Sequence, residues 1–307
     1  MNRRTLLKAI TASSALPFLP SAGSSQTTDK SPHSFIYCIN MATIRGHKLG
    51  FVKELEVASK AGFKAVEIWM DSLQSYVKEG GTLKDAKKRL DDLGIKVENT
   101  IGFAPWIIDD EAKRKEGLEQ MKREMDMLAQ IGCKRTAAPP VGATANAGLD
   151  LKLAAERYHA ILELGDRTGV IPQLEMWGHS KNLSRVSEVM YVALESAHPS
   201  ARILLDIFHL YKGGSSIDTL PLVNPEAVEI LHMNDYPSLP PSTITDAARV
   251  YPGDGTAPIH KILKILGKRQ KPLVLSVEVF NKDYYAQDAL VVAKTALLKL
   301  KAVSAGV

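Results

Sequence analysis

The feature that most constrains the fold is a regular alternation of short apolar runs with longer amphipathic runs, repeated between residues 34 and 302. Short runs rich in β-branched and aromatic residues predict strands, and runs with helical periodicity and caps predict helices. The predicted strands cover residues 34–44, 65–70, 96–103, 134–138, 171–177, 202–208, 228–234 and 273–280. The predicted helices cover 49–60, 82–93, 111–130, 151–168, 183–197, 259–267 and 284–302, with a short irregular segment at 218–222.

Eight strand-helix units in one chain of 307 residues predict an α/β protein with a single (β/α)8 barrel, which we expect to span residues 33–307. This length also permits two ordinary domains. A doubly wound open sheet is the competing architecture, but no Gly-rich dinucleotide fingerprint follows the first predicted strand. We therefore expect no nucleotide cofactor.

The first 25 residues have the organisation of an export signal, with a basic start, an apolar middle at 6–19 and a small-residue end. Arg3 and Arg4, followed by TLLK, resemble the twin-arginine signal of bacteria. The apolar stretch is too short for a membrane span. We expect a periplasmic protein without stable membrane insertion, with a polar linker at 26–32.

The net charge gives little reason to expect a nucleic-acid partner. The formal charge is +5, and without the leader cations Arg3, Arg4 and Lys8 it is +2. Nucleic-acid binders usually concentrate Lys and Arg on one face. The charge and the leader therefore argue against an endonuclease.

The last four predicted strands each end in a potential metal ligand: Glu175, Asp206, His232 and Glu278. In a barrel, reactive residues lie at the carboxyl ends of the strands, so these four meet at one rim. Taken singly, such a carboxylate caps a helix or pairs with a base, and such a His is structural. Three clustered carboxylates repel one another unless a cation is bound. The oxygen-rich set favours Mn²⁺ or Mg²⁺ over Co²⁺ or Zn²⁺.

The order Glu, Asp-x-x-His, His, Glu on these strands resembles the xylose isomerase-like TIM-barrel superfamily, particularly the ketose 3-epimerases and inosose dehydratase-like proteins. The resemblance covers about residues 33–303. It implies that the four rim residues bind one divalent metal ion, and that His209 and Arg249, the latter in ARVYPGDG, bind substrate. A surface salt bridge is the alternative for Arg249. The resemblance also implies a homodimer or homotetramer.

The resemblance further implies a sugar isomerase or epimerase that removes a proton alpha to a carbonyl and passes through an enediolate, with Glu175 and Glu278 as base and acid. A lyase or dehydratase shares this first step and then expels a beta substituent from a 3-keto-glycoside or inosose. The exported location favours it, as does His179, which with Ser180 and Lys181 stands where the family carries another acid. A noncatalytic sugar-binding protein is a third alternative.

Further pocket candidates follow from their places near strand ends. Glu67 could bind a sugar hydroxyl or pair with a buried Lys or Arg, and His179 could reach the substrate. Trp69, Trp106 and Trp177 could stack on a sugar ring or pack in the core.

Overall fold

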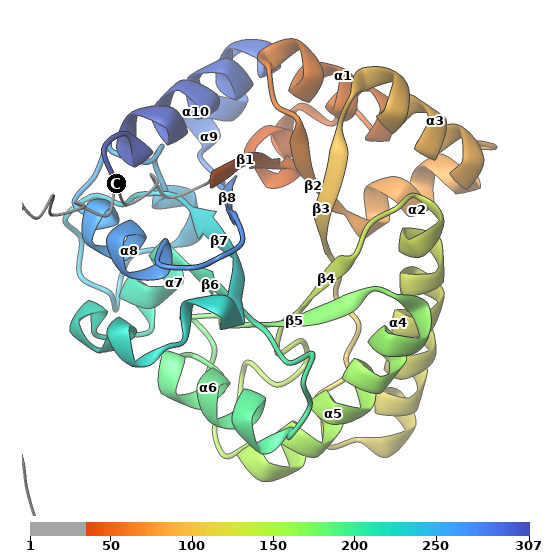
Figure 1. Cartoon of the computed structure of the whole chain (residues 1–307), viewed down its shortest axis with the longest axis vertical. Helices are drawn as coiled ribbons and strands as arrows, with labels where there is room; N and C mark the ends of the chain where they lie inside the picture. Colours follow the sequence, from red (N-terminus) through yellow and green to blue (C-terminus); the bar gives the residue numbers. More distant parts are fainter. Residues whose placement is uncertain (1–34) are drawn as a thin grey trace, which may run out of the picture. The chain divides into compact units, whose positions relative to one another are not determined.

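The computed structural model describes residues 35–307, so the export signal predicted at 1–25 and the linker at 26–32 lie outside the described residues. Between 35 and 307 the chain forms the predicted barrel, with the strands at the centre and the helices around them (Figure 1). The strands are β1 (Phe35–Asn40), β2 (Ala65–Trp69), β3 (Lys96–Ile101), β4 (Arg135–Ala138), β5 (Ile171–Glu175), β6 (Ile203–Asp206), β7 (Val228–Met233) and β8 (Leu273–Val277).

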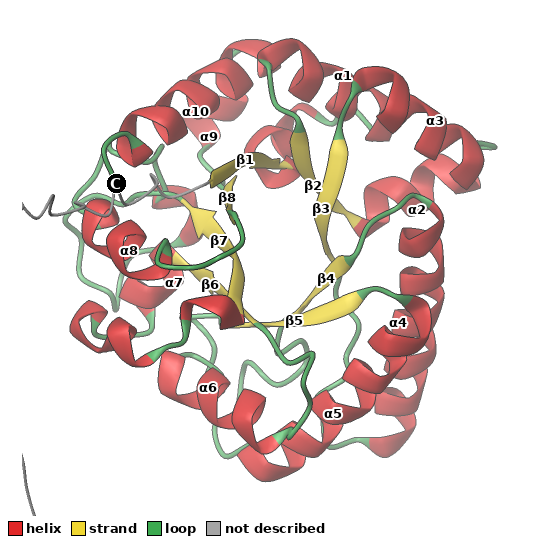
Figure 2. Ribbon diagram, viewed as in Figure 1, coloured by secondary structure: helices red, strands yellow, loops and turns green. Residues whose placement is uncertain are grey.

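The strands follow one another in the order β3-β2-β1-β8-β7-β6-β5-β4, and every backbone pairing between them is parallel. The two end strands, β3 and β4, lie next to each other and nearly close the barrel (Figure 2). Thr136 donates a hydrogen bond to the Thr100 carbonyl oxygen at 3.4 Å, and Arg135 contacts the Glu98 carboxylate at 2.9 Å. All eight carboxyl ends therefore share one rim.

The helices between the strands begin and end where local chemistry predicts. Asp150 accepts hydrogen bonds from two backbone N–H groups at the start of its helix, and Gly169 ends that helix in a left-handed conformation. The helices are α1 (Phe51–Ala61), α2 (Met70–Lys78), α3 (Leu83–Leu93), α4 (Glu111–Gln130), α5 (Leu151–Thr168), α6 (Val186–Glu195), α7 (Ile207–Lys212), α8 (Ile259–Leu266), α9 (Lys282–Tyr285) and α10 (Ala289–Ser304). None of the helices between residues 35 and 307 is both long and apolar enough to span a membrane.

Most predicted strands extend beyond the observed ones, and two of them continue into a helical turn at the rim. The strand predicted at 34–44 ends at Asn40, which caps a 3-10 helix, η1 (Met41–His47). The strand predicted at 202–208 ends at Asp206, which caps α7 by accepting a hydrogen bond from the His209 N–H. Both turns are buried, so their apolar sequences carry no periodicity that separates helix from strand. The separate helix α2 was likewise not predicted.

Inside the barrel, small and medium apolar side chains from seven strands form their own cluster. Its buried members are Cys38, Ala65, Ile101, Ala137, Leu204, Ile230 and Val274. Because side chains alternate along a strand, the residue two positions further points to the same side, one layer nearer the carboxyl rim. The cluster is therefore the floor on which the next layer of side chains rests.

Candidate active site

Directly above this apolar floor lies a buried polar layer. Asn40, Glu67, Asp206, His232 and Ser276 each follow a floor residue by two positions. All five side chains are fully buried. Such groups are costly to bury unless they find partners, so their contacts identify what the layer holds.

The centre of the layer is His232, whose Nδ1 faces three carboxylates. Its distances are 3.3 Å to Glu278 Oε2, 3.6 Å to Asp206 Oδ2 and 3.8 Å to Glu175 Oε1. Ligand atoms of Asp206, His232 and Glu278 all lie within 4.8 Å of one another. The structure thus brings together the four predicted ligands.

Two buried atoms of this cluster have no hydrogen-bond partner within residues 35–307: His232 Nδ1 and Glu175 Oε2. Leaving such an atom unsatisfied costs about 1–3 kcal/mol. A divalent cation would satisfy both atoms, and a set of three carboxylates and one imidazole suits Mg²⁺, Mn²⁺ or Zn²⁺. The residues therefore fit a metal ion.

Arg249 supplies positive charge at the edge of the cluster. Its Nη1 donates to Asp206 Oδ2 at 2.7 Å and to Glu278 Oε2 at 2.9 Å, and its Nε donates to Asp246 Oδ1 at 3.1 Å. Only 1% of Arg249 is exposed, which excludes the surface salt bridge weighed from the sequence. Burial alone would raise the pKa of Asp206, but Arg249 and His232 hold it well below its usual value.

His209 offers a hydrogen-bond donor to a ligand. Burial lowers the pKa of His209 to about 3, so the ring is neutral. Its Nε2 lies 3.2 Å from Arg249 Nη2, which can only donate, so Nε2 accepts and Nδ1 carries the hydrogen. That Nδ1 is buried and finds no hydrogen-bond partner in the part of the chain that the structure describes.

Glu175 has a pKa that is raised toward neutral pH. Burial raises the pKa of Glu175 to about 8; His232 opposes this shift, while Glu278 and Glu67 add to it. The pKa of His232 is raised well above its usual value, because Glu67 and Glu278 outweigh the effect of burial. A carboxyl group poised near neutral pH is suited to proton transfer.

Comparison with known proteins gives this geometry a family. A profile described as xylose isomerase-like TIM barrel matches residues 55–301. The chain belongs to the xylose isomerase-like TIM-barrel family. The inosose isomerase of Halalkalibacterium halodurans is 29% identical over 264 residues, covering 84% of this chain and 93% of that protein. The inosose isomerase of Bacillus subtilis is 27% identical over 265 residues, covering 84% and 94%.

Solved structures show the same fold. The structure of the IolI protein with a zinc atom superimposes with a TM-score of 0.80 at 24% identity, covering 88% of this chain and 98% of that one. An L-ribulose 3-epimerase superimposes with a TM-score of 0.67 at 18% identity, covering 87% and 94%. These likenesses support the barrel architecture of this family member.

Aromatic rings line the mouth above the buried cluster of candidate ligands in this xylose isomerase-like barrel. We call Trp69, Phe103, Trp177, His179 and Phe280 the aromatic collar. Neighbouring rings in the series Phe280, Trp69, Phe103, Trp177, His179 have centroids 6.4, 5.3, 6.3 and 5.3 Å apart. The collar reaches the site, since the rings of His179 and His209 lie 5.5 Å apart. Phe103, which the sequence reasoning missed, is 41% exposed and offers apolar surface at the mouth.

Two sequence candidates occupy other places. Trp106 is fully buried and donates its indole N–H to the Pro139 carbonyl oxygen, so the structure assigns it to the core. Glu67 contacts His232 at 3.0 Å. Its partner is therefore neither the sugar hydroxyl nor the buried Lys or Arg considered from the sequence. Asn234, also missed, donates to both oxygens of Asp206 at 3.1 and 3.2 Å.

The segment after β7 delivers Arg249 to the site and is fastened by Asp235. The backbones of Asp235 and Val250 pair, and the Asp235 carboxylate accepts hydrogen bonds from the N–H groups of Gly253 and Ala257. A Cβ on Gly255 would lie 2.3 Å from Asp235 Oδ1, so the PGDG stretch has no room for a side chain there.

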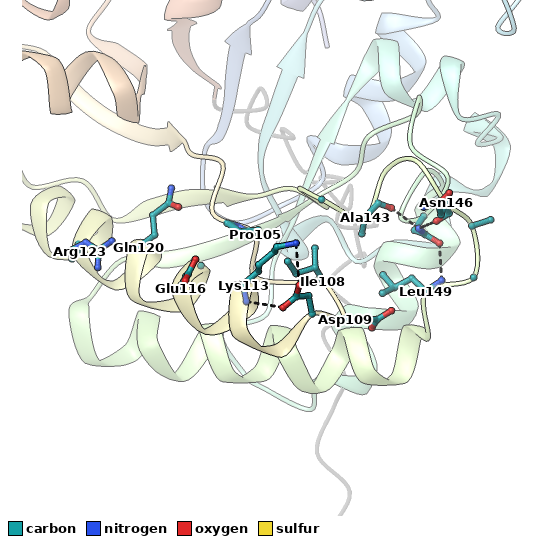
Figure 3. A pocket seen from close by; sticks show the side chains of 16 residues that line it. Pro105, Ile108, Asp109, Lys113, Glu116, Gln120, Arg123, Ala143, Asn146 and Leu149 are labelled. Atoms are coloured by element: carbon teal, nitrogen blue, oxygen red, sulfur yellow. Dashed lines mark hydrogen bonds and ion pairs between the residues drawn. The ribbon is translucent and has the colours of Figure 1, made fainter.

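A separate cavity of about 1040 Å³ lies between α4 and the loops that follow β3, β4 and β5 (Figure 3). Asn182 stabilises the loop after β4, which lines one side of this cavity, by donating hydrogen bonds to the carbonyl oxygens of Ala143 and Asn146. None of the four candidate metal ligands lines this cavity. The chemistry of the buried cluster, not cavity size, identifies the candidate active site.

Proposed function

We propose that this protein is a divalent-metal-dependent sugar isomerase or epimerase that transfers a proton at the carbon alpha to a carbonyl group. The observation that carries the proposal is the buried His232 Nδ1, which faces three carboxylates and has no hydrogen-bond partner among the described residues. The names of the relatives, inosose isomerase and L-ribulose 3-epimerase, support the same class of reaction.

The residues divide into holding and proton-transfer roles. A divalent ion held by Glu175, Asp206, His232 and Glu278 would stabilise the negative charge that develops on the carbonyl oxygen. His209 donates its Nδ1 hydrogen to a substrate oxygen, and Arg249 adds positive charge beside it. Glu175 and Glu278 extend from the ends of β5 and β8, so they reach the substrate from different sides and can act as base and acid.

The oxygen-rich ligand set favours Mn²⁺ or Mg²⁺ as the native ion. Zinc is a second candidate because the similar IolI structure holds a zinc atom. The substrate class is a small keto-sugar or inosose.

The aromatic collar favours a second candidate reaction at the same centre. Exposed aromatic surface at the mouth suits an apolar group attached to the bound ring. After the same proton removal, expulsion of that group from the beta carbon as the protonated aglycone would make the protein a lyase on 3-keto-glycosides. Loss of a beta hydroxyl group as water would instead make it a dehydratase on inososes. Released aglycone, rather than an interconverted sugar, identifies this outcome.

The test is exchange of the substrate's carbon-bound proton with solvent. The Mn²⁺-loaded protein is screened against ketoses, inososes and a 3-keto-glucoside in deuterated water. It should catalyse the incorporation of deuterium at a carbon of its substrate, and Glu278→Gln should abolish this exchange. Glu54→Gln removes a similarly buried acid that accepts a hydrogen bond from Ser72, and should leave exchange intact. Exchange that survives in Glu278→Gln with its metal retained contradicts the assigned mechanism. A wild-type protein that binds sugar but no metal supports the noncatalytic alternative.

The export prediction leads to a proposal about location. An enzyme exported by the twin-arginine route would fold and load its metal in the cytoplasm, and would then meet free sugars in the periplasm. Cell fractionation should find the mature protein in the periplasm, and replacing Arg3 and Arg4 by Lys should retain the protein in the cytoplasm.

A further inference from the structure

Glu67 is a fully hydrogen-bonded acid of the polar layer. Its Oε1 accepts from Asn99 Nδ2 at 2.6 Å and from His232 Nε2 at 3.0 Å. Its Oε2 accepts from Asn40 Nδ2 at 2.8 Å and from Ser276 Oγ at 2.7 Å. A carboxylate has about four acceptor positions, and all four are used. Glu67 is 0% exposed, so it has neither surface nor lone pairs for a substrate hydroxyl.

The contact with His232 determines which nitrogen faces the carboxylates. An ionised carboxylate only accepts hydrogen bonds, so in the neutral form of His232 that could bind a metal ion the ring hydrogen lies on Nε2, toward Glu67. The lone pair is then on Nδ1, the atom 3.3 Å from Glu278 and 3.6 Å from Asp206. Glu67 therefore fixes both the ring orientation and the nitrogen available for coordination.

Asn40 carries the same restraint to Glu278. Its Nδ2 bridges Glu67 Oε2 and Glu278 Oε1, at 2.8 and 3.0 Å. Its Oδ1 accepts from the Ala42 N–H and from Trp69 Nε1, both at 2.9 Å, so the amide cannot turn without losing bonds at both ends. One buried carboxylate thus supports two of the candidate metal ligands.

We propose that Glu67 is a positioning residue that orients His232 directly, and Glu278 through Asn40, for a divalent metal ion. The inference depends on the proposed function only in requiring that this centre binds metal. Partners of this kind contribute about 10–100-fold to metal affinity in other metalloproteins.

Glu67→Gln is the test because it keeps the shape of the side chain. If the amide oxygen of the new Gln side chain still accepts from His232, its NH₂ group faces the NH₂ group of Asn40. Both groups are donors, so the hydrogen bond between residues 40 and 67 is lost and the two side chains must move apart. The dissociation constants for Zn²⁺ by chelator competition, and for Mn²⁺ by electron paramagnetic resonance, should rise about 10–100-fold. Urea unfolding in EDTA checks that the variant is folded.

Two controls separate positioning from general damage. Glu98→Gln alters an equally buried acid whose partners are Arg135 and Lys96, and should leave metal affinity unchanged. Ser276→Ala removes one of the four hydrogen bonds to Glu67, and should weaken metal binding less than Glu67→Gln does. Equal affinity in wild type and Glu67→Gln, or an equal loss in Glu98→Gln, overturns this inference alone. A wild-type protein that binds neither ion overturns the proposed function and this inference together.

Discussion

Replacing Arg249 by Met would remove a guanidinium group that contacts both Asp206 and Glu278. Met keeps much of the aliphatic length but has no hydrogen-bond donors. The change leaves two buried carboxylates without the contacts at 2.7 and 2.9 Å that now offset their charge. The guanidinium also packs over the rings of Phe208 and Phe280, 4.6 and 5.1 Å from their centroids, so some packing is lost as well.

The expected cost follows from the burial of all three groups. Removing one member of a buried ion pair typically costs about 3–5 kcal/mol, because an uncompensated charge stays inside. We expect this loss in the free energy of unfolding of Arg249→Met in EDTA at pH 7.5. An ion at about 100 times its dissociation constant adds about 2.7 kcal/mol. The variant should gain more than the wild type from Mn²⁺, because the ion replaces the missing positive charge.

The assay is urea unfolding followed by Trp fluorescence, in EDTA and in Mn²⁺. Arg135→Met is the matched control, because Arg135 pairs with Glu98 and Glu229, neither of which is a candidate ligand. Its loss of stability should be the same with and without the ion. A loss below about 1 kcal/mol for Arg249→Met in EDTA, or equal stabilisation of variant and wild type by Mn²⁺, would refute the electrostatic reasoning.

Other predictions test the remaining parts of the site. A carboxyl group whose pKa rises from 4.5 to about 8 on folding holds its proton more tightly in the native state, so stability present below pH 4.5 is lost as pH rises to 8. In EDTA, Glu175→Gln should reduce the change in the free energy of unfolding with pH by up to about 1.4 kcal/mol per pH unit. Urea unfolding at pH 5, 6.5 and 8 measures this change, and the same pH dependence in variant and wild type contradicts the raised pKa. Trp106→Phe should lower stability by about 1–3 kcal/mol without changing KM, whereas Trp177→Phe should raise KM with little effect on stability; the reverse pattern would exchange their roles. Gly255→Ala should cost about 1–3 kcal/mol and weaken substrate binding through the Arg249 segment; calorimetry showing an unchanged Tm would contradict the tight contact with Asp235.

The sequence predicted the barrel and the grouping of the four rim residues because both follow from local patterns. Alternating strand and helix signals define the eight units, and Glu175, Asp206, His232 and Glu278 each stand where a strand signal ends. Parallel strands bring such ends to one rim without further information. These residues could therefore be grouped without knowledge of any side-chain contact.

The supporting contacts could not be predicted in this way, since they join residues far apart in the sequence. Nothing local to AVEIWM indicates that Glu67 meets His232, 165 residues later, or that Asn40 also bridges to Glu278. Trp106 and Trp177 both follow strand ends, and only the packing separates a core residue from a rim residue. The overlong strand at 202–208 hid the helical turn that buries His209 beside Arg249.

The most direct test of the metal centre is a crystal structure of the protein grown with Mn²⁺, with anomalous data collected at the manganese edge. We predict one anomalous peak per chain at this centre, in contact with His232 Nδ1 and with the carboxylates of Glu175, Asp206 and Glu278. A fully occupied ion elsewhere, or no peak at this centre at saturating Mn²⁺, would contradict the account.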